Sequence, residues 1–307
     1  MPGISERRVT LVTGKGGVGK TTVATAAALA LARQGRRVLL CETSGATRVP
    51  ALFGKPSRGY DPTQVAPGLW TLSITPAEAI QEYVLLQLHF QRLYRMVFQN
   101  RVMGPFVDAV PGLHDLVQLG KVWFAERETE NGRPRWDSIV VDAPATGHGV
   151  SMLGAPRAMM ELTRAGPFYE NAARIEELVA DPRRTALVLV STAEEMPVRE
   201  TEDLVERLGP MRTLIQGVVL NEVHPAPLPA EVDWPATRGQ LAGAGGPEGL
   251  AAVRIVELER RAVARQDEAR ARLGRLGYPM HELPFLFRRD LGRAELESFA
   301  ATLGVLA

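Results

Sequence analysis

The sequence has very little cysteine and almost no net charge. Cys41 is the single cysteine in 307 residues, which excludes an intrachain disulfide and any Cys-x-x-Cys pair for a metal or an iron–sulfur cluster. The 36 Lys and Arg residues nearly cancel the 35 Asp and Glu residues, leaving a formal net charge of +1. This balance predicts no long-range attraction to nucleic acid or to anionic lipid.

Long apolar runs are also absent. The longest run of small and apolar residues ends at Arg33 and is too short to cross a bilayer. The first seven residues lead straight into an expected strand, so we expect no signal peptide. These features predict a cytoplasmic protein with no intrinsic membrane segment and no nucleic-acid partner.

Short apolar runs typical of buried strands recur along the chain, with helix-like segments between most of them. They lie at 9–13, 38–42, 69–74, 138–142, 186–191 and 214–220. Alternating helices and non-alternating apolar strands predict an α/β fold with a mostly parallel, doubly wound sheet. Ligands of such sheets bind at the carboxyl ends of the strands.

Two stretches break this alternation. Residues 77–128 and 150–181 look helical with no strand between, and we expect them to form an inserted helical subdomain within a single domain of residues 1–307. Residues 224–247 are rich in Pro, Gly and Ala and read as a loop. Residues 248–276 read as a charged helix, in which Glu257–Arg261 and Glu268–Arg272 have the four-residue spacing of stabilising ion pairs.

A glycine-rich motif follows the first expected strand and precedes an Ala- and Leu-rich expected helix. Its sequence, GKGGVGKTT over residues 14–22, fits the phosphate-binding pattern G-x-x-x-x-G-K-[ST] in the required context. Glycines let the backbone wrap around a phosphate, and the helix adds its positive N-terminal end. The predicted nucleotide-binding residues are Gly14, Gly16, Gly17, Val18, Gly19, Lys20, Thr21 and Thr22. Lys20 would reach the β- and γ-phosphates, and Thr21 would ligate Mg²⁺.

The lysine at the second position of this motif carries a family resemblance. The string resembles the deviant Walker A loop of dimerising ATPases, which include arsenite-pump ATPases, tail-anchored-protein-targeting ATPases, partition and division-site ATPases and nitrogenase iron protein. In that family this lysine crosses the dimer interface to the other subunit's phosphates. The resemblance implies that role for Lys15, in a homodimer or in a heterodimer with a paralogous ATPase. The alternative for Lys15 is a solvated surface lysine.

A second motif starts where the strand at 138–142 ends in Asp142, the position at which P-loop ATPases place the carboxylate of the Mg²⁺ shell. Asp142, Thr146, Gly147 and His148 keep the spacing of a switch in the arsenite-pump and tail-anchored-targeting branch, with the proline displaced by one position. The resemblance implies that His148 senses the γ-phosphate. The alternative is a structural histidine at a helix start.

Residues for the nucleotide base are expected further along the chain. Asn221 ends an expected strand at the position where the family's asparagine reads adenine, and its amide can pair with the exocyclic amine and a ring nitrogen. The segment 283–287 resembles the family's base-side loop, which implies base contacts for Pro284 and Phe285. A strand-end cap is the alternative role for Asn221.

The first switch departs from the family pattern. Ser44 stands where the family has an aspartate that positions the attacking water, and serine cannot act as a carboxylate base. Glu42 could orient the water if the strand end turns it inward; otherwise it touches the Mg²⁺ shell or faces solvent. The family's zinc-bridging cysteine pair is also missing, and Cys41 as the one thiol gives an arsenite role little support.

The resemblance implies an ATPase that binds ATP, ADP and Mg²⁺ and couples nucleotide state to the opening and closing of a helical subdomain with a protein client. Lys15, Lys20, Asp142 and Glu42 are the candidate catalytic residues. One alternative is a nucleotide-binding switch that hydrolyses poorly and regulates a paralogous ATPase, which Ser44 favours. A partition or division-site ATPase is another, although residues 291–307 lack a lysine-rich face.

Overall fold

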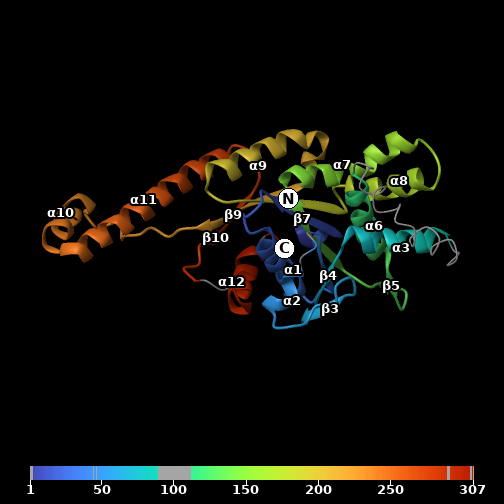
Figure 1. Ribbon diagram of the computed structural model, residues 1–307, viewed down its shortest axis with the longest axis horizontal. Helices are drawn as coiled ribbons and strands as arrows, with labels where there is room; N and C mark the ends of the chain where they lie inside the picture. Colours follow the sequence, from blue (N-terminus) through green and yellow to red (C-terminus); the bar gives the residue numbers. More distant parts are fainter. Residues whose placement is uncertain are drawn as a thin grey trace.

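The computed structural model describes residues 3–43, 45, 47–88, 112–288, 291–304 and 306. Within them, the main sheet has eight strands in the order β10-β9-β8-β1-β7-β2-β4-β3, seen near the centre of Figure 1. A small hairpin, β5–β6, stands apart from it. The strands are β1 (Val9–Gly14), β2 (Val38–Glu42), β3 (Thr63–Ala66), β4 (Leu69–Ser73), β5 (Thr129–Glu130), β6 (Arg133–Pro134), β7 (Ser138–Ala145), β8 (Thr185–Ser191), β9 (Ile215–Val223) and β10 (Met280–Pro284).

The predicted parallel sheet is confirmed. Its strands pair in parallel except at one edge, where β3 runs antiparallel to β4. Every residue of β1, β2 and β8 is buried, as expected for central strands covered on both faces. All six predicted strands are present. The edge strands β3 and β10 were not predicted.

Helices cover both faces of the sheet (Figure 1). One face carries α1 (Lys20–Arg33), α2 (Val49–Leu52) and α12 (Arg293–Leu303), and the other carries α6 (Leu113–Arg127), α7 (Thr146–Thr163), α8 (Pro167–Val179) and α9 (Glu195–Arg207). The 3₁₀ turns η1 (Ile4–Glu6) and η2 (Gly209–Leu214) complete the layers. The buried side of α1 is mostly alanine, so this helix can lie close against the strands. Each face therefore has its own apolar core.

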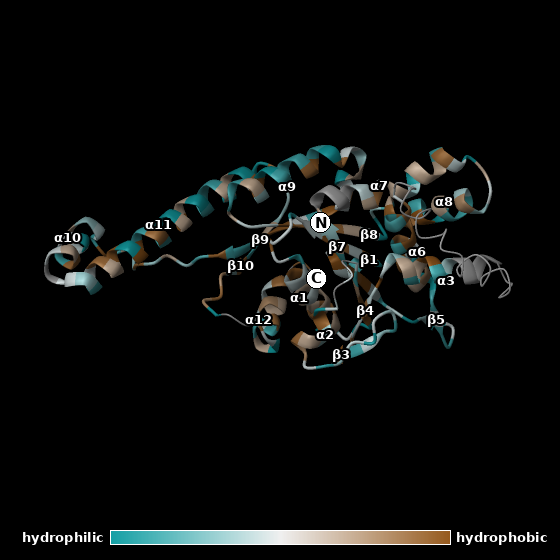
Figure 2. Cartoon of the chain, in the orientation of Figure 1, coloured by the Kyte–Doolittle hydropathy of each residue, from teal (hydrophilic) through white to brown (hydrophobic). Residues whose placement is uncertain are grey.

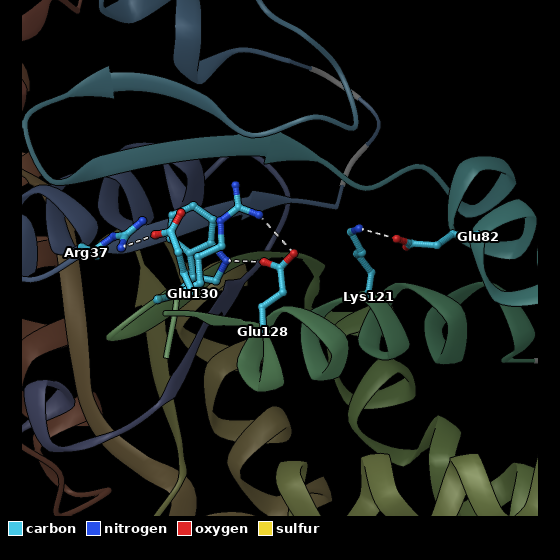
Figure 3. Close-up of polar contacts among 7 residues, drawn as sticks. Arg37, Glu82, Lys121, Glu128 and Glu130 are labelled. Carbon is cyan, nitrogen blue, oxygen red and sulfur yellow. Dashed lines mark hydrogen bonds and ion pairs between the residues drawn. The ribbon is translucent and has the colours of Figure 1, made fainter. Parts of the chain in front are cut away.

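The helices expected as a subdomain pack on one another and on the sheet. Lys121 of α6 forms an ion pair of 2.7 Å with Glu82 of α3 (Pro76–Leu88). Just beyond α6, Glu128 accepts hydrogen bonds from Trp136 Nε1 at 2.9 Å and Arg135 Nη1 at 3.1 Å (Figure 3). Apolar residues of α6, α7 and α8 belong to the same buried cluster as the strands. Residues 89–111 of the predicted insertion lie outside the described residues. That these helices form a separate subdomain stays a prediction.

The predicted loop at 224–247 is wrong in its second half, where α10 (Trp234–Ala244) forms. The Asp233 side chain accepts a hydrogen bond from the Ala236 backbone N–H at 3.3 Å, and a proline fills the first turn, which together start a helix despite its glycines. The predicted charged helix is confirmed as α11 (Gly246–Gly274), which extends away from the sheet with α10 at its far end (Figure 1).

The ion pairs of α11 differ from those expected. Glu257 pairs with Arg238 of α10 at 2.9 Å, and Arg272 pairs with Glu202 of α9 at 2.5 Å, so both join helices rather than successive turns. Most residues of α9 and α11 are hydrophilic, with scattered apolar residues along α11 (Figure 2). No helix in the described part of the chain combines the length and apolarity that a bilayer crossing requires.

Candidate functional site

The glycine-rich loop joins β1 to α1 at the carboxyl edge of the sheet. A Cβ atom at Gly14 would lie 2.1 Å from the carbonyl oxygen of Val190, so glycine is required where β1 approaches β8. Gly19 has a left-handed φ of 85°, and a Cβ there would lie 2.3 Å from the Asn221 amide nitrogen. Gly16 and Gly17 form the exposed crest of the loop. This backbone has the shape that a phosphate cradle needs.

Lys20, the first residue of α1, folds back over the loop. Its Nζ donates a hydrogen bond to the carbonyl oxygen of Lys15 at 2.9 Å. Burial lowers the pKa of Lys20, and the negative charge of Asp142 opposes this shift. The ammonium group therefore lies inside the loop and beside the helix N-terminus, where an anion would be bound.

Thr21 at the start of α1 and Asp142 of β7, the two predicted metal ligands, lie in contact. Thr21 Oγ1 donates a hydrogen bond to Asp142 Oδ2 at 2.6 Å, and Asp142 is only 3% exposed. Burial raises the pKa of Asp142, while the Thr21 hydrogen bond and the Lys20 charge lower it. A hydroxyl and a carboxylate are hard oxygen donors, so this pair fits Mg²⁺ completed by phosphate oxygens and water.

Glu42 ends β2 directly beside Asp142 of β7, with the two residues in register. The Glu42 side chain is buried and accepts hydrogen bonds from the backbone N–H groups of Arg48 at 2.7 Å and Val49 at 3.2 Å. A third comes from the Thr71 hydroxyl at 3.3 Å. Burial raises the pKa of Glu42, and these hydrogen bonds oppose the shift. Glu42 thus holds the start of α2, and its catalytic role stays a prediction. Ser44 lies outside the described residues.

The second switch begins where β7 passes into α7. The backbone of Thr146, Gly147 and His148 forms the first turn of α7, and their side chains lie outside what the structure describes. The hydroxyl of Thr13 in β1 donates to the carbonyl oxygen of Pro144 at 3.1 Å, which fixes the entrance of the switch against the phosphate loop. The predicted role of His148 stays a prediction.

The residues expected to contact the nucleotide base surround a cavity beside the glycine-rich loop. Asn221 Nδ2 donates to the carbonyl oxygen of Val18 at 3.0 Å, which ties β9 to the loop. A cavity of about 240 Å³ opens next to it, lined by predicted and unpredicted residues. The predicted ones are Gly19, Thr22, Asn221, Pro284 and Phe285, and Leu286 belongs to the predicted segment 283–287; Glu222, Arg288, Leu291 and Phe299 were not predicted. The sequence motifs therefore converge on one site.

Two further contacts near the loop were missed. Lys15 Nζ forms an ion pair of 2.9 Å with Glu200 of α9, so the lysine does leave the cradle, toward a carboxylate of its own chain. Gln118 of α6 is buried and donates to the carbonyl oxygens of Thr43 at 2.9 Å and Ile74 at 2.7 Å. It links α6 to the ends of β2 and β4. In the sequence, the only sign of this role was that Gln118 is a single amide on an otherwise apolar helix face.

Known proteins resemble this chain over most of its length. A family model described as anion-transporting ATPase matches residues 7–166 and 161–234. The ATPase BagA of Mycobacterium tuberculosis is 33% identical over 257 residues, which cover 79% of this chain and 75% of that protein. An arsenical pump-driving ATPase of Acidiphilium multivorum is 30% identical over 69% of this chain and 39% of its own length. The ATPase GET3 of Komagataella phaffii is 26% identical over 69% and 72%.

Proposed function

The chain is an ATPase of the anion-transporting ATPase family, and from this premise we propose that it acts as a Mg²⁺-dependent dimer whose nucleotide state opens and closes a helical region that holds a protein client. The client surface would lie on α3, α6, α7 and α8. A cytoplasmic location belongs to the same proposal.

One observation carries the nucleotide chemistry: Lys20, Thr21 and Asp142 meet at the loop. Thr21 and Asp142, 2.6 Å apart, would hold Mg²⁺, which when bound neutralises charge on the β- and γ-phosphate oxygens. Lys20 would exchange the carbonyl oxygen of Lys15 for a phosphate oxygen. The loop N–H groups and the N-terminus of α1 supply further positive potential, so catalysis rests on positioning and electrostatic stabilisation.

The proposed dimer depends on Lys15. Its side chain lies outside the cradle and is partly exposed, as is its partner Glu200, so it can exchange that carboxylate for a phosphate on another subunit. Either a second copy of this chain or a paralogous ATPase could supply the phosphate. The chain lacks a cysteine pair for a bridging zinc, so other contacts would hold the dimer together.

A second candidate function is a nucleotide-binding switch that hydrolyses slowly and regulates a paralogous ATPase. The hydrogen bonds of Glu42 favour this second function. Both oxygens of its carboxylate already accept hydrogen bonds within the chain, so the carboxylate is less available to orient a water molecule. Ser44 adds no carboxylate. A missing base lowers a hydrolysis rate by roughly 10²–10⁴-fold. In this case Ser44→Asp should raise phosphate release, whereas a chain with another base should show little response.

The test combines calorimetry with phosphate release. Lys20→Ala should abolish detectable binding of ATP in the presence of Mg²⁺, while Lys55→Ala, at an exposed lysine away from the loop, should retain it. Thermal unfolding of both variants checks that they fold. Unchanged affinity in Lys20→Ala would overturn the assignment of the loop. Phosphate release by the wild-type chain, alone and mixed with candidate paralogues, separates the ATPase from the regulatory switch.

A further inference from the structure

The cavity beside the loop is bordered by a part of β9 where the strand is irregular. Between the pairs Glu282–Leu220 and Pro284–Val223, β9 has one more residue than β10, which makes a bulge at Asn221 and Glu222. Successive residues of a regular strand point to opposite faces. A bulge re-aims a side chain, and here both Asn221 and Glu222 line the cavity.

Glu222 adopts an unfavourable backbone conformation to form this bulge. Its φ is 59°, in the left-handed region that glycine adopts freely and a residue with a Cβ does not. Strained positions of this kind gather at functional sites. The structure therefore has a carboxylate where a glycine would be the easier choice for the backbone.

Two acceptor groups, from Asn221 and Glu222, line the cavity. The Asn221 Nδ2 atom is directed to the carbonyl oxygen of Val18, which leaves Oδ1 as the acceptor of that amide. Arg288 also lines the cavity, and its Nη1 atom pairs with Glu295 at 2.8 Å. The Glu222 carboxylate makes no hydrogen bond or ion pair with another described residue. Burial raises the pKa of Glu222, although the residue as a whole is exposed, so its carboxylate is open to a bound donor.

We propose that Glu222 determines the base specificity of the nucleotide site. Its carboxylate accepts a hydrogen bond from the 6-amino group of adenine, beside the Oδ1 atom of Asn221, and repels the 6-oxo group of other purines. The amino group offers two N–H donors, which matches the two acceptors, whereas a 6-oxo group would place its lone pairs against them. The inference rests on the proposed nucleotide function of this site.

The experiment compares ATP, inosine triphosphate and deoxy-ATP by calorimetry with Mg²⁺ on the full chain. The wild-type chain should prefer ATP to inosine triphosphate, and Glu222→Gly should reduce that preference about 10–100-fold, the worth of a hydrogen bond to a charged group. Its melting temperature should rise, because glycine accepts the backbone conformation. Glu222→Gln should favour inosine triphosphate, since its amide can donate to the oxo group.

One control variant and three outcomes decide the result. Glu194→Gln removes a neighbouring charge that acts on Glu222 without lining the cavity, and it should leave the preference unchanged. An unchanged preference in Glu222→Gly, with a raised melting temperature, would reduce Glu222 to a strained structural residue and overturn the inference. In another outcome, Glu222→Gly keeps the preference for ATP over inosine triphosphate and loses only a preference for ATP over deoxy-ATP. That result would assign the carboxylate to the ribose and overturn the inference as well. A wild-type chain that binds no nucleotide would refute the proposed function instead.

Discussion

Replacing Glu42 separates a structural anchor from a catalytic base. Glu42→Ala removes the acceptor of the Arg48 and Val49 backbone N–H groups at 2.7 and 3.2 Å, and of the Thr71 hydroxyl at 3.3 Å. Glu42→Gln keeps one acceptor oxygen for the two backbone N–H groups but loses the negative charge, and its N–H₂ group obliges the Thr71 hydroxyl to accept instead of donate. Both variants therefore disturb the start of α2 to different degrees.

The expected magnitudes follow from these contacts. Hydrogen bonds to a charged group contribute about 1.5–3 kcal/mol each, and buried donors left without a partner add to the loss. Because two backbone donors lose their acceptor, Glu42→Ala should lower the free energy of unfolding by about 3–5 kcal/mol, and Glu42→Gln by about 1–2 kcal/mol. At roughly 2–4 °C per kcal/mol, the alanine variant should melt about 10 °C lower.

The assay is guanidinium unfolding together with single-turnover hydrolysis by the folded variants. Glu130→Gln is the matched control, since it makes the same change at an exposed carboxylate paired with Arg37, and its unfolding should match that of the wild-type chain. If Glu42→Gln left unfolding unchanged while hydrolysis fell more than ~100-fold, Glu42 would be the base. The anchoring role described above would then be wrong.

Three further predictions concern the loop and its surroundings. Gly19→Ala should weaken ATP binding at least ~10-fold by calorimetry, since a left-handed φ costs a residue with a Cβ about 1–2 kcal/mol, and full affinity would contradict the strained geometry. Glu200→Gln should release Lys15, so light scattering with a non-hydrolysable ATP analogue should detect dimers at lower protein concentration, and an unaltered dimerisation curve would argue against competition between the two contacts. Arg272 holds the pKa of Glu202 below its usual range, so this pair stabilises the fold above the unfolded-state pKa and the contribution disappears as pH falls through the folded-state pKa. Glu202→Gln should flatten that acid limb of the stability curve, and identical limbs would show that the pair adds nothing.

The sequence predicted the centre of the sheet better than its edges. Central strands such as β2 and β8 are uninterrupted apolar runs because both of their faces are covered. At the edges, β3 has only four residues and β10 includes His281, Glu282 and Pro284, which contradict an apolar pattern. Helix α10 was missed because its glycines and proline lower helix propensity, while the cap at Asp233 and packing on α11 stabilise it.

The site was predictable where its residues are contiguous or belong to recognised motifs. The loop and its meeting with Asp142 fall in that class. The pairing of Lys15 with Glu200 depends on how α9 packs, and no local pattern specifies it. The orientation of Glu222 depends on a bulge that arises from the register of two strands, which a single sequence does not reveal.

The central position of β1 has a consequence for the making of this protein. β1 pairs on one side with β7 and on the other with β8, so its neighbours are Ser138–Ala145 and Thr185–Ser191. A ribosome adds about 5–20 residues per second, so the edge of β1 that pairs with β8 has no partner until roughly 10–35 s after β1 itself is translated. The nascent chain therefore completes the strand pairs beside its phosphate loop only after more than half of its length has been made.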